Sequence, residues 1–158
     1  MVSDYIWYEY TDFINFEVID INSSNLSVSK VQLDDFSNHI DRVQISINKF
    51  NSQINWDDMW DLDQAQERLS NENILYLFLK NESPIGHVWY KEGFLFNAFV
   101  SNERLDGESQ WFIEQTMQDR NNSGYETITL YTEYWNHRAN SFWKKLKYNI
   151  INKSELRL

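Results

Sequence analysis

The sequence predicts a mixed α/β (α+β) fold, with a mostly antiparallel sheet flanked by about four helices. Residues 74–100 hold three apolar or alternating runs separated by the turn sequences Asn-Glu-Ser-Pro and Glu-Gly, which is typical of an antiparallel meander. The pattern after residue 100 is helix, strand, helix, and such an order requires a parallel crossover. Before the meander, residues 33–69 carry apolar side chains at helical spacing.

Residues 1–69 are expected to supply two or three strands and two helices. Residues 1–24 are rich in aromatic and β-branched side chains, which indicates an extra hairpin or one irregular strand packed on the main sheet. Residues 25–31 alternate as a short strand does, and a second helix over residues 62–69 would begin at Asp61 or Asp63. The first helix, from residue 33, has one apolar face formed by Phe36, Ile40, Val43 and Ile47.

Length and composition limit the possible functions. A chain of 158 residues is expected to form a single domain, residues 1–158. Its formal net charge of −10 argues against a nucleic-acid binder or a ligand of anionic membranes, because both need a basic face. The same charge either attracts a cationic substrate or simply keeps the protein in solution. No cysteine, apolar span or signal-peptide pattern is present, so we expect a cytoplasmic protein without a thiolate site.

The first motif with chemical meaning is the loop Arg-Leu-Asp-Gly-Glu-Ser, residues 104–109, between a strand and a helix. A loop that enters a helix presents unpaired backbone N–H groups and the positive end of the helix dipole, which together bind phosphate. Gly107 would let the backbone approach a ligand closely. An ordinary strand-to-helix turn is the alternative interpretation.

The second motif follows the strand of residues 127–133 and covers residues 136–148. It reads Asn-x-x-Ala-x-x-Phe-Trp-x-Lys-x-x-Tyr, and the apolar side chains form one helical face. Together and in this order, the two motifs resemble those of the GNAT superfamily of acyl-CoA-dependent N-acyltransferases. The residues that match the family pattern are Arg104, Gly107, Asn136, Ala139, Phe142, Lys145 and Tyr148, and Ser109 stands at a small-residue position.

The resemblance implies an acetyl-CoA-binding core over residues 74–148, with residues 1–24 as an N-terminal aromatic extension. The sheet would splay between the fourth and fifth core strands, with a bulge near Phe99 and Val100. The pantetheine arm would lie in the splay, and the amides of the loop would hold the pyrophosphate. The implied coenzyme-binding residues are Phe99, Val100, Arg104, Leu105, Asp106, Gly107, Glu108, Ser109, Asn136, Ala139 and Phe142.

Several positions depart from the family pattern. Trp143 replaces the tyrosine that commonly protonates the departing thiolate, and an indole N–H is not an acid at neutral pH. Asp106 and Glu108 place two carboxylates in a pyrophosphate loop, where they would repel the ligand unless both point to solvent. Residues 94–99 lack a carboxylate, and Asn97 is their one polar side chain. Lys147 stands where a glycine normally ends the helix.

Candidates for the reacting groups are therefore Tyr134, Glu133 and Asn97, where Asn97 has a structural amide as its alternative role. Trp56, Trp60 and Asp57 are candidate acceptor-binding residues, and tryptophans of the core beside an acidic turn are the alternative. His87 is expected to be a surface or core histidine rather than a base. No metal site is predicted, because the three histidines are far apart in the sequence.

The leading hypothesis is an N-acetyltransferase that transfers an acetyl group directly to a primary amine in a ternary complex. The acceptor would be a small molecule or a peptide, and the protein would be a monomer or a homodimer. The alternative is a GNAT-fold binding module that has lost catalysis. A third hypothesis is a dimeric structural protein that uses residues 1–24 as an added strand.

Overall fold

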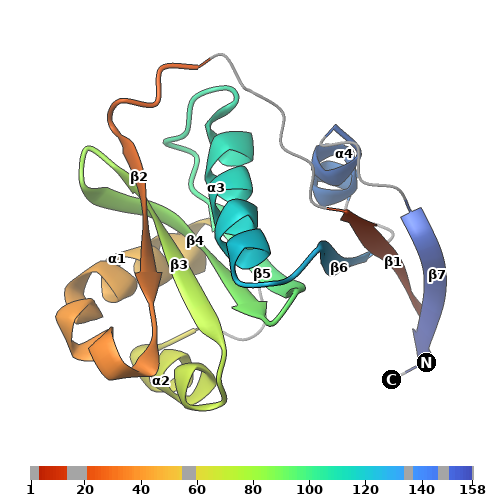
Figure 1. Cartoon of the computed structure of the whole chain (residues 1–158), viewed down its shortest axis with the longest axis horizontal. Coiled ribbons are helices and arrows are strands. Elements are labelled where there is room, and N and C mark those ends of the chain that lie inside the picture. The colour runs from red at the N-terminus through yellow and green to blue at the C-terminus, as the bar shows by residue number, and fades with distance from the viewer. Residues whose placement is uncertain (1–3, 14–20, 55–59, 134–136, 146–149, 158) are drawn as a thin grey trace.

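A computed structural model describes residues 4–13, 21–54, 60–133, 137–145 and 150–157. One seven-stranded sheet organises the chain, in the order β2-β3-β4-β5-β6-β1-β7 (Figure 1). All neighbouring strands are antiparallel except β5 and β6, which are parallel, so the mixed, mostly antiparallel fold is confirmed. The strands are β1 (Asp4–Phe13), β2 (Leu26–Val31), β3 (Ile74–Lys80), β4 (Ser83–Lys91), β5 (Phe94–Val100), β6 (Thr127–Glu133) and β7 (Ile150–Arg157).

The helices begin close to the predicted positions. Asp61 is the N-cap of α2: its carboxylate accepts a hydrogen bond from the N–H of Gln64 at 2.8 Å, and the Gln64 side chain accepts one from the Asp61 N–H at 3.2 Å. The helix predicted from residue 33 is divided, because a 3-10 helix ends at Asn38 and His39 separates it from α1. The helical elements are η1 (Leu33–Asn38), α1 (Ile40–Gln53), α2 (Leu62–Ser70), α3 (Glu108–Asn122) and α4 (His137–Lys145).

The helices form two separate cores, one on each face of the sheet. On one face, η1, α1 and α2 bury side chains such as Val43 and Leu69 against Leu77 and Trp89 of the sheet. On the other face, Phe112 and Met117 of α3 and Trp143 of α4 pack against Phe78 and neighbouring side chains. In the described part of the chain, no helix combines the length and apolarity that crossing a membrane requires.

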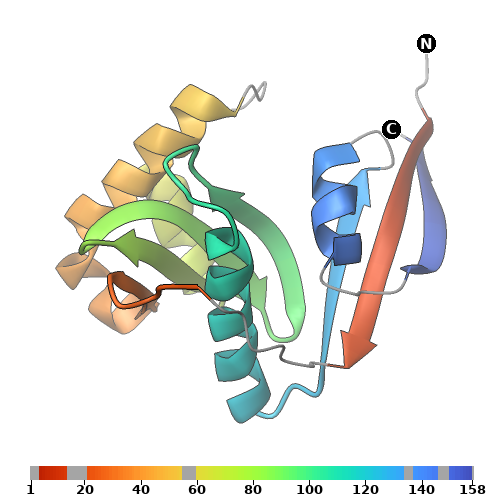
Figure 2. The same ribbon diagram turned by 90° about the horizontal axis from the view of Figure 1, so that it is seen from above.

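The parallel pair β5–β6 is the weak point of the sheet. The two strands pair only at Phe94 with Thr129 and at Leu95 with Leu130, and they then diverge. Figure 2 shows the two parts of the sheet leaving this point like the arms of a V. The predicted splay between the fourth and fifth core strands is therefore confirmed.

The bulge in β5 lies elsewhere than the resemblance implied. The register with β4 shifts between Trp89, which faces Asn97, and Tyr90, which faces Leu95, so Phe96 is the extra residue. Phe99 and Val100 keep regular pairing with β4. The expected bulge near Phe99 and Val100 is thus wrong, and the kink instead adjoins the last residue that pairs with β6.

The N-terminal strand fills a place that the sequence did not indicate. Strand β1 lies between β6 and β7 and pairs antiparallel with both, while β7 was not predicted at all. Because both edges of β1 are used within the chain, this strand has no free edge with which to extend the sheet of a partner. This arrangement removes the basis for the third hypothesis.

A partly buried polar network ties α3 to the sheet, with Tyr76 and Arg120 buried and Lys30 and Asp119 partly exposed. The Tyr76 hydroxyl donates to the Asp119 carboxylate and accepts from Nε of Arg120 at 2.8 Å, and Lys30 pairs with Asp119 at 3.1 Å. Burial raises the pKa of Tyr76, so this hydroxyl keeps its proton. Burial also raises the pKa of Asp119, but hydrogen bonds from Tyr76 and Lys30 outweigh this effect and leave it below its usual value.

Replacing Tyr76 by Phe should lower the free energy of unfolding by about 1–3 kcal/mol, because it leaves buried polar partners without the hydroxyl. Tyr125→Phe is the matched control, since the Arg120 guanidinium also lies over the Tyr125 ring, at 5.5 Å. The control should change stability by less than about 0.5 kcal/mol. Urea unfolding measures both variants, and equal losses would contradict the role given to the hydroxyl.

Candidate functional site

The loop between β5 and α3 is shaped by Gly107, which has a φ of 83°. This left-handed conformation is easily adopted only by glycine, and it turns the chain directly into the first turn of α3. In the described part of the chain, the N–H groups of Asp106, Gly107, Ser109 and Gln110 make no hydrogen bond. They lie at the positive end of the α3 dipole, which is a favourable environment for an anion.

Two other amides of the predicted cradle already have partners. The N–H of Leu105 donates to the Glu108 carboxylate at 2.7 Å, and the N–H of Glu108 donates to the Leu105 carbonyl at 3.2 Å. The Glu108 side chain is buried and pairs with Lys80 at 2.9 Å. From the sequence, Glu108 has to point to solvent if the loop is to bind pyrophosphate. Glu108 is buried instead, and Lys80 neutralises its carboxylate. Asp106 is exposed.

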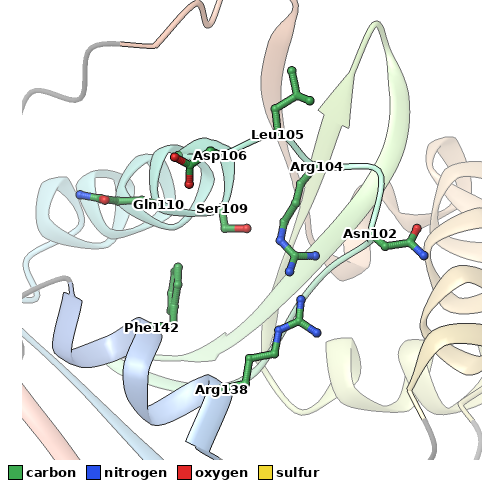
Figure 3. Close-up of a pocket in the computed structure, with 9 residues that line it drawn as sticks. Asn102, Arg104, Leu105, Asp106, Ser109, Gln110, Arg138 and Phe142 are labelled. Carbon is green, nitrogen blue, oxygen red and sulfur yellow. The ribbon is translucent and has the colours of Figure 1, made fainter.

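Two guanidinium groups face the same space from different elements. Nη1 of Arg104 donates to the carbonyl oxygens of Val100 at 3.1 Å and Ser101 at 3.0 Å, and these bonds fix the orientation of the planar group. Arg138 extends from α4 toward Arg104 (Figure 3). Within the described residues, neither arginine forms an ion pair. Two unpaired arginines together are notable in a chain of net charge −10.

These groups line an open cavity of about 310 Å³ at the start of α3. Its wall combines the free amides of the helix N-terminus, two guanidinium groups, one exposed carboxylate and one aromatic ring (Figure 3). The cavity suits an anion with several oxygen atoms. The lining residues are Asn102, Arg104, Leu105, Asp106, Gly107, Ser109, Gln110, Arg138 and Phe142.

Six of the predicted coenzyme-binding residues line this cavity: Arg104, Leu105, Asp106, Gly107, Ser109 and Phe142. Asn102, Gln110 and Arg138 were missed by the sequence reasoning. Arg138 precedes Ala139 in the second motif, at a position for which the family pattern specifies no residue type. Arg138 contributes to the cavity because it faces Arg104 in the folded chain. The spacing of residues in the sequence does not reveal this proximity.

Other predicted residues lie away from the cavity. The buried Phe99 ring packs edge-on against Phe50 with centroids 5.4 Å apart, and Ala139 packs against the core under α3. Asn97 is half-buried on β5, and Glu133 ends β6. Trp60 packs in the α1–α2 core, 5.9 Å from Trp89. Trp56, Asp57, Tyr134, Asn136 and Lys147 lie outside the described residues.

His87 is a core histidine, as expected. Its Nδ1 lies 2.6 Å from Oγ of Ser46, and both side chains are buried beside the rings of Phe50 and Phe99. Burial lowers the pKa of His87 to about 3, so the imidazole is neutral at physiological pH. Among the described residues, no three His, Asp or Glu side chains are grouped to hold a metal ion.

No protein-family model matches the sequence, and no curated protein matches it. Solved structures do match its shape. A Drosophila protein superimposes with a TM-score of 0.69 at 11% identity, over 98% of this chain and 50% of that protein. An aminoglycoside acetyltransferase from an uncultured soil metagenomic sample superimposes with a TM-score of 0.57 at 17% identity, over 78% of this chain and 88% of that protein. A GCN5-related N-acetyltransferase from Sphaerobacter thermophilus superimposes with a TM-score of 0.62 at 8% identity, over 97% of this chain and 50% of that protein.

At these identities the likeness concerns the fold, and it shows that this chain has the GNAT fold that the two motifs predicted. The chain spans about half the length of the Drosophila and Sphaerobacter proteins. Trp143, which occupies the usual tyrosine position, is buried in the α3 core. Its place in the core agrees with a packing role.

His87 should make stability depend on pH. The pKa of His87 is lowered from the ordinary 6.5 to about 3 in the folded protein. Below pH 6.5, His87 therefore binds a proton in the unfolded chain but stays neutral in the folded protein. The free energy of unfolding should therefore fall by about 2 kcal/mol between about pH 7.5 and about pH 5. Urea titrations should show that the free energy of unfolding of His87→Gln depends less on pH than that of wild type. The control His39→Gln should keep the pH dependence of wild type. An unchanged slope in His87→Gln would contradict this assignment.

Proposed function

We propose that this protein is an N-acetyltransferase that transfers the acetyl group of acetyl-CoA to a primary amine of a small molecule or a peptide. One observation carries the proposal: two unpaired arginines and four free amides surround a cavity where β5 leads into α3. The residues that line this cavity come from the loop after β5, the start of α3 and α4, and β5 and β6 are apart where β5 reaches that loop (Figure 2). The name of one structural neighbour, an aminoglycoside acetyltransferase, supports the reaction class.

The pyrophosphate of the coenzyme fits the cavity chemically. The N–H groups of Asp106, Gly107 and Ser109 would donate to phosphate oxygens, and the helix dipole favours the negative charge. Arg104 and Arg138 would approach the anion from opposite sides and form charge-assisted hydrogen bonds. Lys80 removes the penalty of a carboxylate in the loop, because it already pairs with Glu108 at 2.9 Å.

Among the described residues, no strand pairs with the β6 side of β5 beyond Leu95, and the pantetheine arm would bind along that edge. Ser101 donates its N–H to the Ile85 carbonyl of β4 at 2.7 Å, and antiparallel pairing alternates direction along the strand. The backbone of Phe99 therefore faces β4, whereas that of Val100 faces the divergence. Val100 would bond the arm through its N–H, while its carbonyl accepts from Arg104. Asn136, which follows β6 in the sequence, would also bond the arm.

In the proposed reaction, the neutral amine nitrogen attacks the thioester carbonyl carbon and gives up one proton through water, the carbon–sulfur bond breaks, and the thiolate takes a proton. We assign Tyr134 as the donor of that proton and Glu133 as the carboxylate that contacts the acceptor amine. Asn97 would donate a hydrogen bond to the reacting carbonyl. Trp56, Asp57 and Trp60 would border the acceptor. Most of the rate enhancement would come from holding the two substrates together.

A coenzyme-binding module without catalysis is the second candidate function. It is favoured by Trp143, whose indole is 5% exposed and fills the core at the usual position of the proton donor. Calorimetric titration with acetyl-CoA followed by a thiol-release assay over a panel of amines separates the two. Coenzyme binding with no thiol release for any amine would favour the module, and no binding at millimolar acetyl-CoA would exclude both.

Replacing Gly107 by Val should weaken acetyl-CoA binding by about 10-fold or more, because the side chain enters the cradle and the backbone resists a positive φ. Gly124→Val is the matched control: Gly124 also has a positive φ, of 104°, but lies beyond the other end of α3. Each variant should lose about 1–2 kcal/mol of stability. Equal effects of the two variants on acetyl-CoA affinity would show that the loop does not bind the coenzyme.

Arg138→Gln and Arg104→Gln should each weaken acetyl-CoA binding about 10- to 100-fold, because each removes a charge-assisted hydrogen bond to phosphate. S-acetylpantetheine, which lacks the pyrophosphate, should bind wild type and variants alike. Arg42→Gln on α1 is the control, since Arg42 does not line the cavity. Calorimetry measures all four proteins, and an equal loss for both ligands would contradict phosphate binding by the arginines.

A further inference from the structure

A row of aromatic rings on the α2 side of β4 and β5 carries one guanidinium group. The centroids of Trp60 and Trp89 are 5.9 Å apart, those of Trp89 and Phe96 are 6.4 Å apart, and those of Phe96 and Phe94 are 6.1 Å apart. Neighbouring rings are inclined by 31°, 26° and 23°, so the row presents nearly parallel faces. Arg68 of α2 lies over it, with Cζ 4.1 Å from the Trp60 centroid and 5.4 Å from that of Phe96.

Arg68 has no acidic partner among the residues that the structure describes. Within the described residues it forms no ion pair, although the chain has ten more acidic than basic side chains. Its half-buried position lowers its pKa through desolvation, which the neighbouring charge of Glu67 partly opposes. Stacking satisfies the face of the guanidinium but leaves the N–H donors along its edge free. Such a group is ready to bind a carboxylate.

The row of rings adjoins the point where the sheet opens. Phe96 is the bulged residue, and it directly follows Leu95, the last residue of β5 that pairs with β6. Ser101, at the phosphate end of the strand, is five residues away, which corresponds to roughly 16 Å of extended chain. A pantetheine arm that lies along β5 from the cavity therefore ends close to Phe96. Trp89 and Phe96 belong to the face covered by α1 and α2, opposite α3.

We infer that the acceptor amine bears a carboxylate group, which Arg68 binds while Phe94 and Phe96 pack against the apolar part of the molecule. This inference rests on the proposed function, because it places the acceptor beside the acetyl group at the divergence. A planar guanidinium fixed by stacking binds a carboxylate through two parallel hydrogen bonds. It also repels polyamines and aminoglycosides, which bring positive charge to the same place. The predicted substrate class is therefore amino acids and related amino carboxylates.

The test compares acceptors that differ only in charge. Thiol release is measured with acetyl-CoA, the common α-amino acids, their carboxamides and spermidine. For each amino acid that wild type acetylates, kcat/KM should be higher than for the corresponding carboxamide. Arg68→Gln should lower kcat/KM for the carboxylate about 10- to 100-fold, mainly through KM, and leave the amide nearly unchanged. Arg68→Lys, which keeps the charge but not the planar fork, should lose less, and Arg42→Gln should behave as wild type.

The ratio between acid and amide is compared across variants, so that differences in the basicity of the two amines cancel. Thermal unfolding of each variant tests whether Arg68 only stabilises α2: in that case stability falls and both acceptors are affected equally. That result would overturn the inference, and so would a preference for amides or spermidine.

Failure of this inference is distinguishable from failure of the proposed function. If no acceptor reacts, or if acetyl-CoA does not bind, binding of the same acids and amides is followed by ligand-observed NMR. Binding of carboxylates that Arg68→Gln abolishes supports the inference even though the enzyme hypothesis fails. Absence of any binding that depends on Arg68, at millimolar ligand, overturns it even if acetyl-CoA binds.

Discussion

The separation of β5 from β6 after only two residue pairs is the constraint on which the rest of the structure depends. A strand edge that opens inside a sheet leaves backbone polar groups without ladder partners, and these groups need other partners. Arg104 meets part of that need by donating to the Val100 carbonyl. In the proposed function, the remaining edge would bind the coenzyme, because an amide-rich arm can pair there as a strand does.

The charges of the chain divide into two groups with different roles. The lysines near the loop are paired: Lys80 neutralises Glu108, and Lys49 bonds Glu103 at 2.8 Å and the Pro84 carbonyl at 2.8 Å. The hydrogen bond from Lys49 holds the pKa of Glu103 below its usual value, so this bond persists at neutral pH. Arg104, Arg138 and Arg68 have no such acidic partners among the described residues. Lysines thus fix the loop, while the arginines remain available to anionic ligands on either side of β5.

For the proposed reaction, the described residues favour catalysis by positioning rather than by a strong acid or base. His87 is neutral and sealed in the core, and burial raises the pKa of Tyr90. Trp143 fills space beside α3. An amine and a thioester held at the divergence need little more than orientation and one proton donor, since the thioester is already activated toward amines. The aromatic row and the cavity lie on opposite sides of β5. This arrangement suits a reaction in which the cavity would hold the coenzyme and the aromatic row would hold the acceptor.

Local patterns in the sequence determined the meander, the loop glycine, the α2 cap and the two motifs, because each depends on neighbours within a few residues. The GNAT fold and six cavity residues followed from them. Only the tertiary structure decided the place of β1 between β6 and β7, the bulge at Phe96, the pairing of Glu108 with Lys80 and the convergence of Arg138 on Arg104. The bulge depends on the register of the β4–β5 hairpin, and the other features join residues distant in sequence. Such contacts are fixed by strand register and packing, which leave no periodic signal in the chain.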